Sequence, residues 1–231
     1  MDAAGDRVGR ITFPGNPWPE GHAIKEFVWS GRLEADGDVW MDFHLESENY
    51  YAEREVEDDE DHSDWEAPIV WGNYHACTLS STHWPGQFRG GRVGGQDDPV
   101  RFGGLCDSTV FADDVGPDDE YDYDLHVAFG INLLGHDGVA GHSIRLTPNG
   151  GGRCDVHWTG RIAQAYAGLM NFEHTFEALA TGVKFDGFVV TETMSDQVAQ
   201  ESFRRAVIDH ERFELQRGAD GLRRFVLLAR P

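Results

Sequence analysis

Residues 26–46 read EFVWSGRLEADGDVWMDFHLE, and this stretch decides the fold class. Apolar and polar residues alternate in both of its halves, which is the period of a β-strand with one buried face. The halves flank residues 35–37 (Ala-Asp-Gly), a three-residue loop with glycine where a left-handed conformation is needed. Pairing across this loop places Trp29 opposite Phe43. Turn and hydrophobic pattern therefore predict the same antiparallel hairpin.

The alternating pattern continues outward from this hairpin. Residues 125–133 and 139–147 predict a second hairpin, turning at Asp137-Gly138, which is a favoured two-residue turn. Further strands are expected at residues 10–13, 69–79, 154–162, 185–191, 213–217 and 224–228. One helix is expected at 196–209, because Ser195 is a good N-cap and the apolar residues behind it follow the helical period.

These elements predict a mainly β protein. We expect a single domain over residues 1–231, an antiparallel β-sandwich or flattened barrel with one C-terminal α-helix. The alternative is an α+β fold, since residues 163–181 alternate like a strand but contain enough alanine for a helix. Two long surface loops are expected, an acidic one at 53–66 and a Gly/Asp-rich one at 85–122.

The charge of the chain limits its partners. The 231 residues include 41 acidic and 19 basic ones, a formal net charge of −22. Such a chain lacks the basic footprint that nucleic-acid binding requires, and an anionic membrane surface repels it. This acidity has three alternative explanations, which are solubility, adaptation to high salt and attraction to a basic partner. The oligomeric state is left open.

The cysteines and the start of the chain predict a cytoplasmic protein. Cys77, Cys106 and Cys154 are few, odd in number and far apart, so we expect small buried thiols and no disulfide framework. The first residues lack the basic and apolar regions of a signal peptide. No run of residues is long and apolar enough to form a membrane span.

A repeated Asp-x-His step is the first candidate site. It occurs at 42–44, 124–126 and 155–157, and on a strand its two polar residues share one face. If the three strands were neighbours, their outer face would offer imidazoles and carboxylates to a divalent metal ion or to acid–base chemistry. The candidate metal ligands are Asp42, His44, Glu46, His126, Asp155 and His157. The alternative is a solvated polar face of the sheet.

Exposed tryptophans beside acidic residues are the second candidate site. Aromatic residues carry much of the binding energy at protein interfaces, and carboxylates attract a basic partner. The candidate partner-binding residues are Trp40, Trp65, Trp84, Glu60 and Asp61.

The function expected from the sequence is therefore binding. We expect an acidic, inhibitor- or immunity-like interaction protein that recognises a basic protein partner, because no established catalytic motif occurs in the chain. No cofactor is expected for that function. The alternative is a metal-dependent enzyme that uses the Asp/His face.

Overall fold

The hairpin predicted at residues 26–46 is present and forms part of a closed sheet. The computed structural model describes residues 9–56 and 63–228, and it pairs β2 (His22–Leu33) with β3 (Val39–Ser47). Trp29 lies opposite Phe43, so the predicted register is confirmed. Gly37 has a φ of 91°, the left-handed conformation that the loop requires.

The other elements follow along the described residues in chain order. The strands are β1 (Gly9–Thr12), β4 (Thr78–Ser80), β5 (Gly91–Gly94), β6 (Thr109–Ala112), β7 (Gly130–Asn132), β8 (His136–Pro148), β9 (Arg153–Ala163), β10 (His174–Val190), β11 (Phe213–Arg217) and β12 (Arg223–Leu227). The helices are α1 (Pro68–Tyr74), α2 (Phe102–Leu105) and α3 (Asp196–Ala206), with 3-10 turns at Ala165–Ala167 and His210–Arg212.

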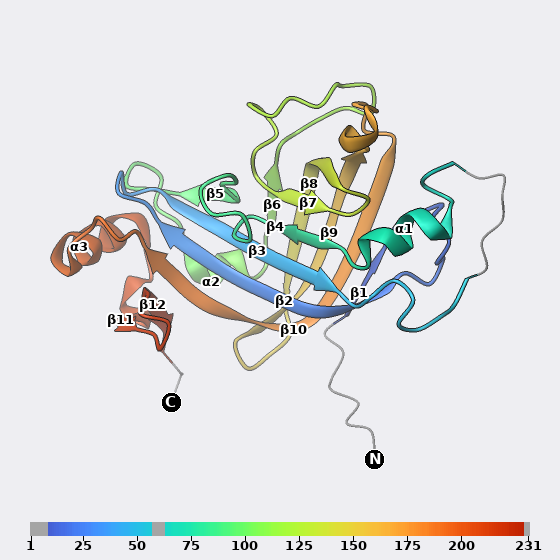
Figure 1. Cartoon of the computed structure of the whole chain (residues 1–231). Helices are drawn as coiled ribbons and strands as arrows, with labels where there is room; N and C mark the ends of the chain where they lie inside the picture. The colour runs from blue at the N-terminus through green and yellow to red at the C-terminus, as the bar shows by residue number, and fades with distance from the viewer. Residues whose placement is uncertain (1–8, 57–62, 229–231) are drawn as a thin grey trace, which may run out of the picture.

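The sheet closes on itself. Its strands follow the order β1-β2-β3-β4-β7-β8-β9-β10, and β10 pairs in turn with β1 and, in parallel, with β2. The β11–β12 hairpin extends the sheet beyond the second half of β10. The fold is therefore mainly β, a flattened barrel with a C-terminal helix (Figure 1).

Aromatic side chains fill the interior of the barrel. Trp29, Phe43, Phe129 and Trp158 are each at most 1% exposed. The ring centroid of Trp158 lies 4.8 Å from that of Phe129 and 5.7 Å from that of Phe43, so β9 and β3, which do not pair in the sheet, meet at these rings. Burial of this kind supplies the main driving force for folding.

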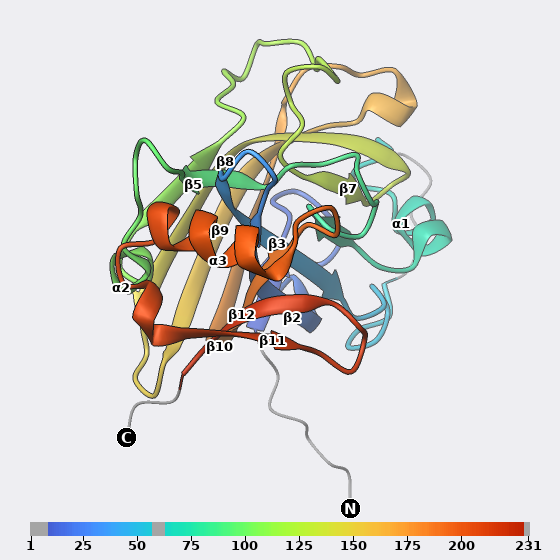
Figure 2. The same cartoon turned by 90° about the vertical axis from the view of Figure 1, so that its left-hand side faces the viewer.

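The C-terminal helix covers one end of the barrel. Val198 donates its backbone N–H to the Ser195 hydroxyl, which confirms the predicted N-cap. The α3 helix ends at Ala206, three residues before the predicted end. Phe203 stacks on Phe225 of β12 with their centroids 3.9 Å apart, so α3 and the β11–β12 hairpin pack together (Figure 2).

Residues 69–79 form a helix followed by a short strand, not the single strand predicted. Pro68 begins α1, and proline favours the first turn of a helix because it has no N–H to leave unbonded. Trp71 turns into the core from this helix. Within the described residues, no helix is long and apolar enough to cross a membrane.

The second hairpin turns earlier than predicted. Asn132 pairs with His136, so the turn lies at residues 133–135 and not at Asp137-Gly138. The Asp137 carboxylate, directly after the turn, accepts a hydrogen bond from Leu134 N–H and thereby fixes the turn. Residues 125–129 form no strand. Within residues 163–181, left open by the sequence, the 3-10 turn Ala165–Ala167 is followed by the first half of β10, which begins at His174.

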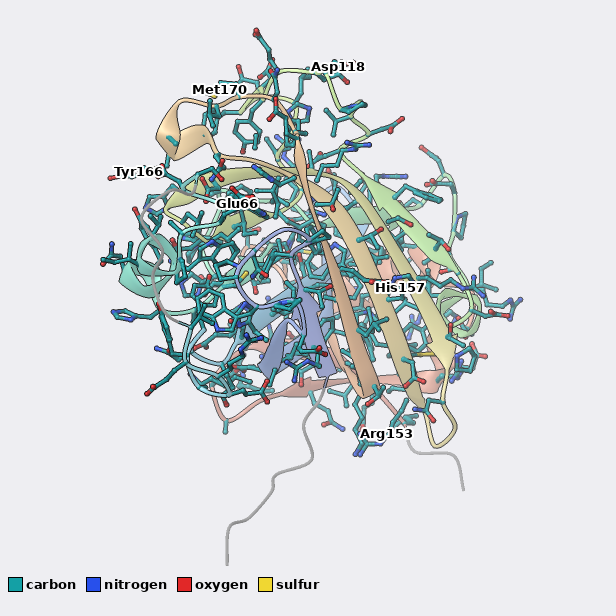
Figure 3. The ribbon with its side chains drawn as sticks, turned by 90° about the vertical axis from the view of Figure 1, so that its right-hand side faces the viewer. Glu66, Asp118, Arg153, His157, Tyr166 and Met170 are labelled. Carbon is teal, nitrogen blue, oxygen red and sulfur yellow. A yellow bond between two sulfur atoms is a disulfide. The ribbon has the colours of Figure 1, made fainter. Side chains whose placement is uncertain are left out.

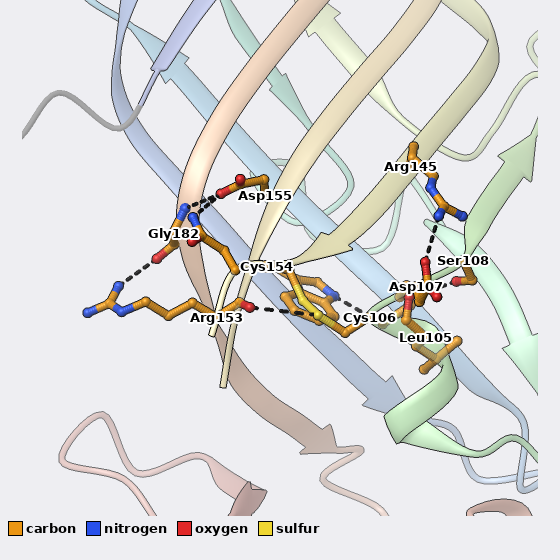
Figure 4. The surroundings of a disulfide bond; sticks show 12 residues. Leu105, Cys106, Asp107, Ser108, Arg145, Arg153, Cys154, Asp155 and Gly182 are labelled. Atoms are coloured by element: carbon orange, nitrogen blue, oxygen red, sulfur yellow. Dashed lines mark hydrogen bonds and ion pairs between the residues drawn. A yellow bond between two sulfur atoms is a disulfide. The ribbon is translucent and has the colours of Figure 1, made fainter. Parts of the chain in front are cut away.

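Two of the three cysteines are joined, contrary to the expectation of unpaired thiols. A disulfide links Cys106, just after α2, to Cys154 at the start of β9 (Figure 4). The cysteines are 48 positions apart and their Cα atoms 6.1 Å apart, within the range that disulfides span. Such bonds persist in oxidising compartments, so the cysteines no longer support the cytoplasmic expectation. Cys77 stays a buried free thiol, as expected.

Candidate functional site

Two loops meet at one end of the barrel and expose several large apolar side chains. One runs from β6 to β7 and the other from β9 to β10. Tyr121 donates its N–H to the Met170 carbonyl at 3.0 Å, and Glu120 forms an isolated β-bridge with Asn171. Residues 114–125 and 165–173 of these loops are called the acidic loop surface below. They lie side by side at the top of Figure 1.

Large apolar side chains project from the acidic loop surface into solvent. Their exposed fractions are 63% for Tyr123, 69% for Leu125, 67% for Tyr166, 56% for Leu169 and 40% for Met170. Figure 3 shows Tyr166 and Met170 at the same end of the molecule as Asp118. Exposed apolar side chains gathered in one region are unusual for an isolated soluble protein and are typical of interaction sites.

The exposed charged side chains of the same surface are all carboxylates, and Arg161 of β9 lies next to it, donating to the Phe172 carbonyl at 3.3 Å. Its exposed carboxylates are Asp114, Asp118, Asp119, Glu120, Asp122, Asp124 and Glu173. The chain contains no lysine or arginine between Arg101 and Arg145, nor between Arg161 and Lys184. No cationic side chain of these loops therefore neutralises the surface.

Buried rings hold the two loops in place from beneath. The centroid of Phe172 lies 5.7 Å from that of Tyr121 and 5.3 Å from that of His126. The Asp122 backbone donates to His126 Nδ1 at 2.9 Å, so this ring nitrogen is an acceptor. His126, a metal candidate in the sequence, is thus a packing residue of the loop here.

Of the three tryptophans predicted as contact residues, one is buried and two are half-buried. Trp65 is only 4% exposed and stacks on His174 with centroids 3.8 Å apart. Trp40 and Trp84 are half-buried, and Trp84 packs between His83 and Phe88. The other two predicted contact residues, Glu60 and Asp61, lie outside the described residues.

Two of the predicted metal ligands come together on the outer face of the β2–β3 hairpin. His44 and Glu46 lie two residues apart on β3, and Glu26 of β2 pairs opposite Glu46. One ligand atom from each of the three lies within 4.8 Å of the other two. Burial lowers the pKa of His44, and the neighbouring His83 adds to this while Glu26 and Glu46 oppose it. The ring is therefore favoured in its neutral form.

Asp42 belongs to a separate, buried ion pair. Both of its carboxylate oxygens accept from Arg32 Nη1 at 2.9 Å, and Ser81 Oγ donates to Oδ1 at 2.8 Å. Burial raises the pKa of Asp42, while Arg32 and Ser81 act in the opposite direction. With its oxygens already occupied, Asp42 takes a structural role in the hairpin.

The remaining metal candidates lie on another part of the barrel. His157 of β9 contacts Glu177 of β10 with Nε2 and Oε1 2.7 Å apart, and it faces solvent (Figure 3). Asp155 accepts from Asn149 and from Gly182 N–H (Figure 4). Around the closed sheet, β2 and β10 lie between β3 and β9 on the shorter path, and residues 124–126 lie in a loop. The three Asp-x-His steps are therefore not neighbours.

A pocket of about 430 Å³ opens where β1, β2 and the end of β3 meet. Arg10 and Glu53 form an ion pair at 2.7 Å in its wall. His22 lies behind them, 3% exposed, with Nε2 3.3 Å from Asn16 Nδ2. Burial, with a smaller effect from Arg10, lowers the pKa of His22 to about 4. His22 is thus a neutral packed residue.

The sequence did not point to the exposed residues of the acidic loop surface. The alternation from Leu125 to Leu133 predicts a strand with Leu125 on its buried face, whereas the structure exposes Leu125 in a loop. The sequence feature that could have indicated this surface is the acidic composition of residues 114–125, which include no lysine or arginine.

Comparisons with protein families, with curated proteins and with solved structures find no match for this chain.

Proposed function

We propose that the protein is a binding protein that recognises a basic protein partner through the acidic loop surface. One observation carries the proposal: five large apolar side chains stand exposed among carboxylates in two loops that contain no lysine or arginine. Tyrosine and methionine are enriched at protein interfaces, where they fill pockets of the partner.

Charge complementarity determines the kind of partner. The negative potential of the loops attracts a positively charged surface and speeds its encounter, while the apolar side chains supply the affinity. The fitting partner is a protein with an exposed amphipathic segment, apolar on one side and rich in lysine or arginine on the other. The loops repel nucleic acid and anionic lipid for the same reason.

A defined peptide tests the proposal. The probe is a synthetic amphipathic helix with leucine on one face and lysine on the other, and binding is followed by fluorescence anisotropy. The paired change Tyr166→Ser and Met170→Ser removes two exposed apolar contacts, so we expect affinity to fall about ten-fold or more. Asp118→Asn with Asp124→Asn is expected to slow association and to reduce its dependence on salt.

Matched variants elsewhere provide the controls. Leu179 is 50% exposed on β10, and Asp97 is an exposed carboxylate before α2. Leu179→Ser and Asp97→Asn should leave binding unchanged. Equal losses in control and loop variants, or equal binding of a peptide with glutamate in place of lysine, would contradict the proposal.

A further inference from the structure

The outer face of the β2–β3 hairpin brings together three side chains that suit a metal ion. Glu26 and Glu46 face each other across the two strands, and His44 lies beside Glu46 on the same face of β3. Two like charges directly opposite each other destabilise a sheet unless a cation lies near them. The pair therefore favours the binding of a positive ion.

Two of the three side chains have free ligand atoms. Within the described part of the chain, Glu26 makes no hydrogen bond or ion pair, and His44 Nδ1 is buried without a hydrogen-bond partner. The third, Glu46, accepts a hydrogen bond from Lys25 Nζ at 2.6 Å. The Lys25 side chain is 53% exposed, so this pair is weak and an ion can replace it.

The geometry and the ligand types point to one class of ion. Ligands around a tetrahedral zinc ion lie about 3.4 Å apart, so ligand atoms already within 4.8 Å of one another need only small side-chain movements. One imidazole and two carboxylates suit zinc and similar divalent transition metals better than calcium, which prefers oxygen alone.

We propose that Glu26, His44 and Glu46 bind one divalent transition metal ion, with Lys25 as the cation that it displaces. Three protein ligands leave a coordination position open for water or a small ligand. This site lies on the β2–β3 hairpin, is built from other residues than the acidic loop surface, and does not depend on the function proposed for that surface.

Isothermal titration of the purified protein with zinc tests the site. Because 41 acidic residues attract any cation, the titration is run in excess magnesium and moderate salt. We expect one zinc ion bound per chain. His44→Ala and Glu26→Gln should each weaken binding about ten-fold or more, since even a residue that only supports a ligand changes metal affinity by that factor.

Lys25 gives the sharpest comparison. Lys25→Ala frees Glu46, so zinc should bind up to about five-fold more tightly. Lys184, the only other lysine in the chain, is exposed on β10 and is the charge-matched control. Lys184→Ala should leave the affinity for zinc unchanged.

His157 and Glu177 are the matched controls for the ligands, because they form an exposed His–Glu pair on another part of the barrel. His157→Ala and Glu177→Gln should bind zinc like the unmodified protein. Circular dichroism confirms that each variant is folded. The proposal is overturned if no stoichiometric binding survives in magnesium, if ligand and control variants lose affinity equally, or if Lys25→Ala weakens binding.

Discussion

His142 lies inside the barrel as a neutral ring. It is 2% exposed, and its Nδ1 accepts a hydrogen bond from Trp158 Nε1 at 3.1 Å. Burial lowers its pKa from 6.5 to about 3. The unfolded chain takes up a proton below about pH 6.5 and the folded chain does not, so stability is lost as the pH falls from 6.5 toward 3.

A substitution at this residue tests the linkage. His142→Gln keeps an acceptor for Trp158 but cannot titrate. Between pH 6 and 5 the free energy of unfolding should therefore fall about 1 kcal/mol less in the variant than in the unmodified protein. Urea unfolding at both pH values measures the difference. Parallel pH profiles for the two proteins would show that His142 is protonated in the folded state.

Loss of Arg32 should lower the free energy of unfolding more than loss of its partner Asp42. Asp42 has a side chain only 3% exposed and a single cationic partner, whereas Arg32 also contacts Glu34 and the Arg89 carbonyl. Arg32→Met leaves a buried carboxylate unpaired and should cost about 3–5 kcal/mol, while Asp42→Asn should cost clearly less. Chemical denaturation of the two variants and of the unmodified protein measures these losses of unfolding free energy. A larger loss for Asp42→Asn would refute this account.

At the level of elements, barrel closure depends on a glycine. Gly31 of β2 pairs with Phe188 of β10, and a Cβ added at Gly31 would lie 2.3 Å from Phe188 Cδ1. Gly31→Ala should therefore destabilise the fold by about 1–3 kcal/mol through overpacking. Gly104→Ala, where no atom lies within 4 Å of the added Cβ, is the control. Phe188→Leu should rescue part of the loss if this contact is the cause.

Elements could be predicted where local turn chemistry and hydrophobic period agree. The first hairpin, its register and the Ser195 cap follow from neighbouring residues alone. The second hairpin was misplaced because Asp137 fixes the turn through its side chain, a contact that Asp-Gly spacing does not reveal. The approach of Glu26 to His44 and Glu46 follows from the hairpin register, in which Glu26 pairs with Glu46, but the Asp-x-His spacing within single strands does not reveal it.

Across the whole molecule, charge is distributed unevenly over the barrel. Carboxylates with a cationic partner lie on strands, on α3 and in several other loops, as in the pairs of Arg205 with Glu201 and of Arg92 with Asp38. The acidic loop surface has no such partners from its own loops. The sequence predicted a Gly/Asp-rich surface loop at residues 85–122, but the gathering of apolar side chains beside its acidic end depends on tertiary contacts with the distant β9–β10 loop.

The disulfide should contribute to the stability of the whole molecule because it closes a long loop. The 48-position separation of Cys106 and Cys154 spans β6, β7 and β8, and cross-linking restricts the unfolded chain over that length. The chain-entropy model gives about 4 kcal/mol for such a loop. Replacing both cysteines by serine should lower the free energy of unfolding by about 2–4 kcal/mol in denaturant. Dithiothreitol should destabilise the unmodified protein by a similar amount and leave the double variant unchanged. If mass spectrometry finds three free thiols and the reductant has no effect, the two cysteines are unpaired in solution and the barrel is stable without them.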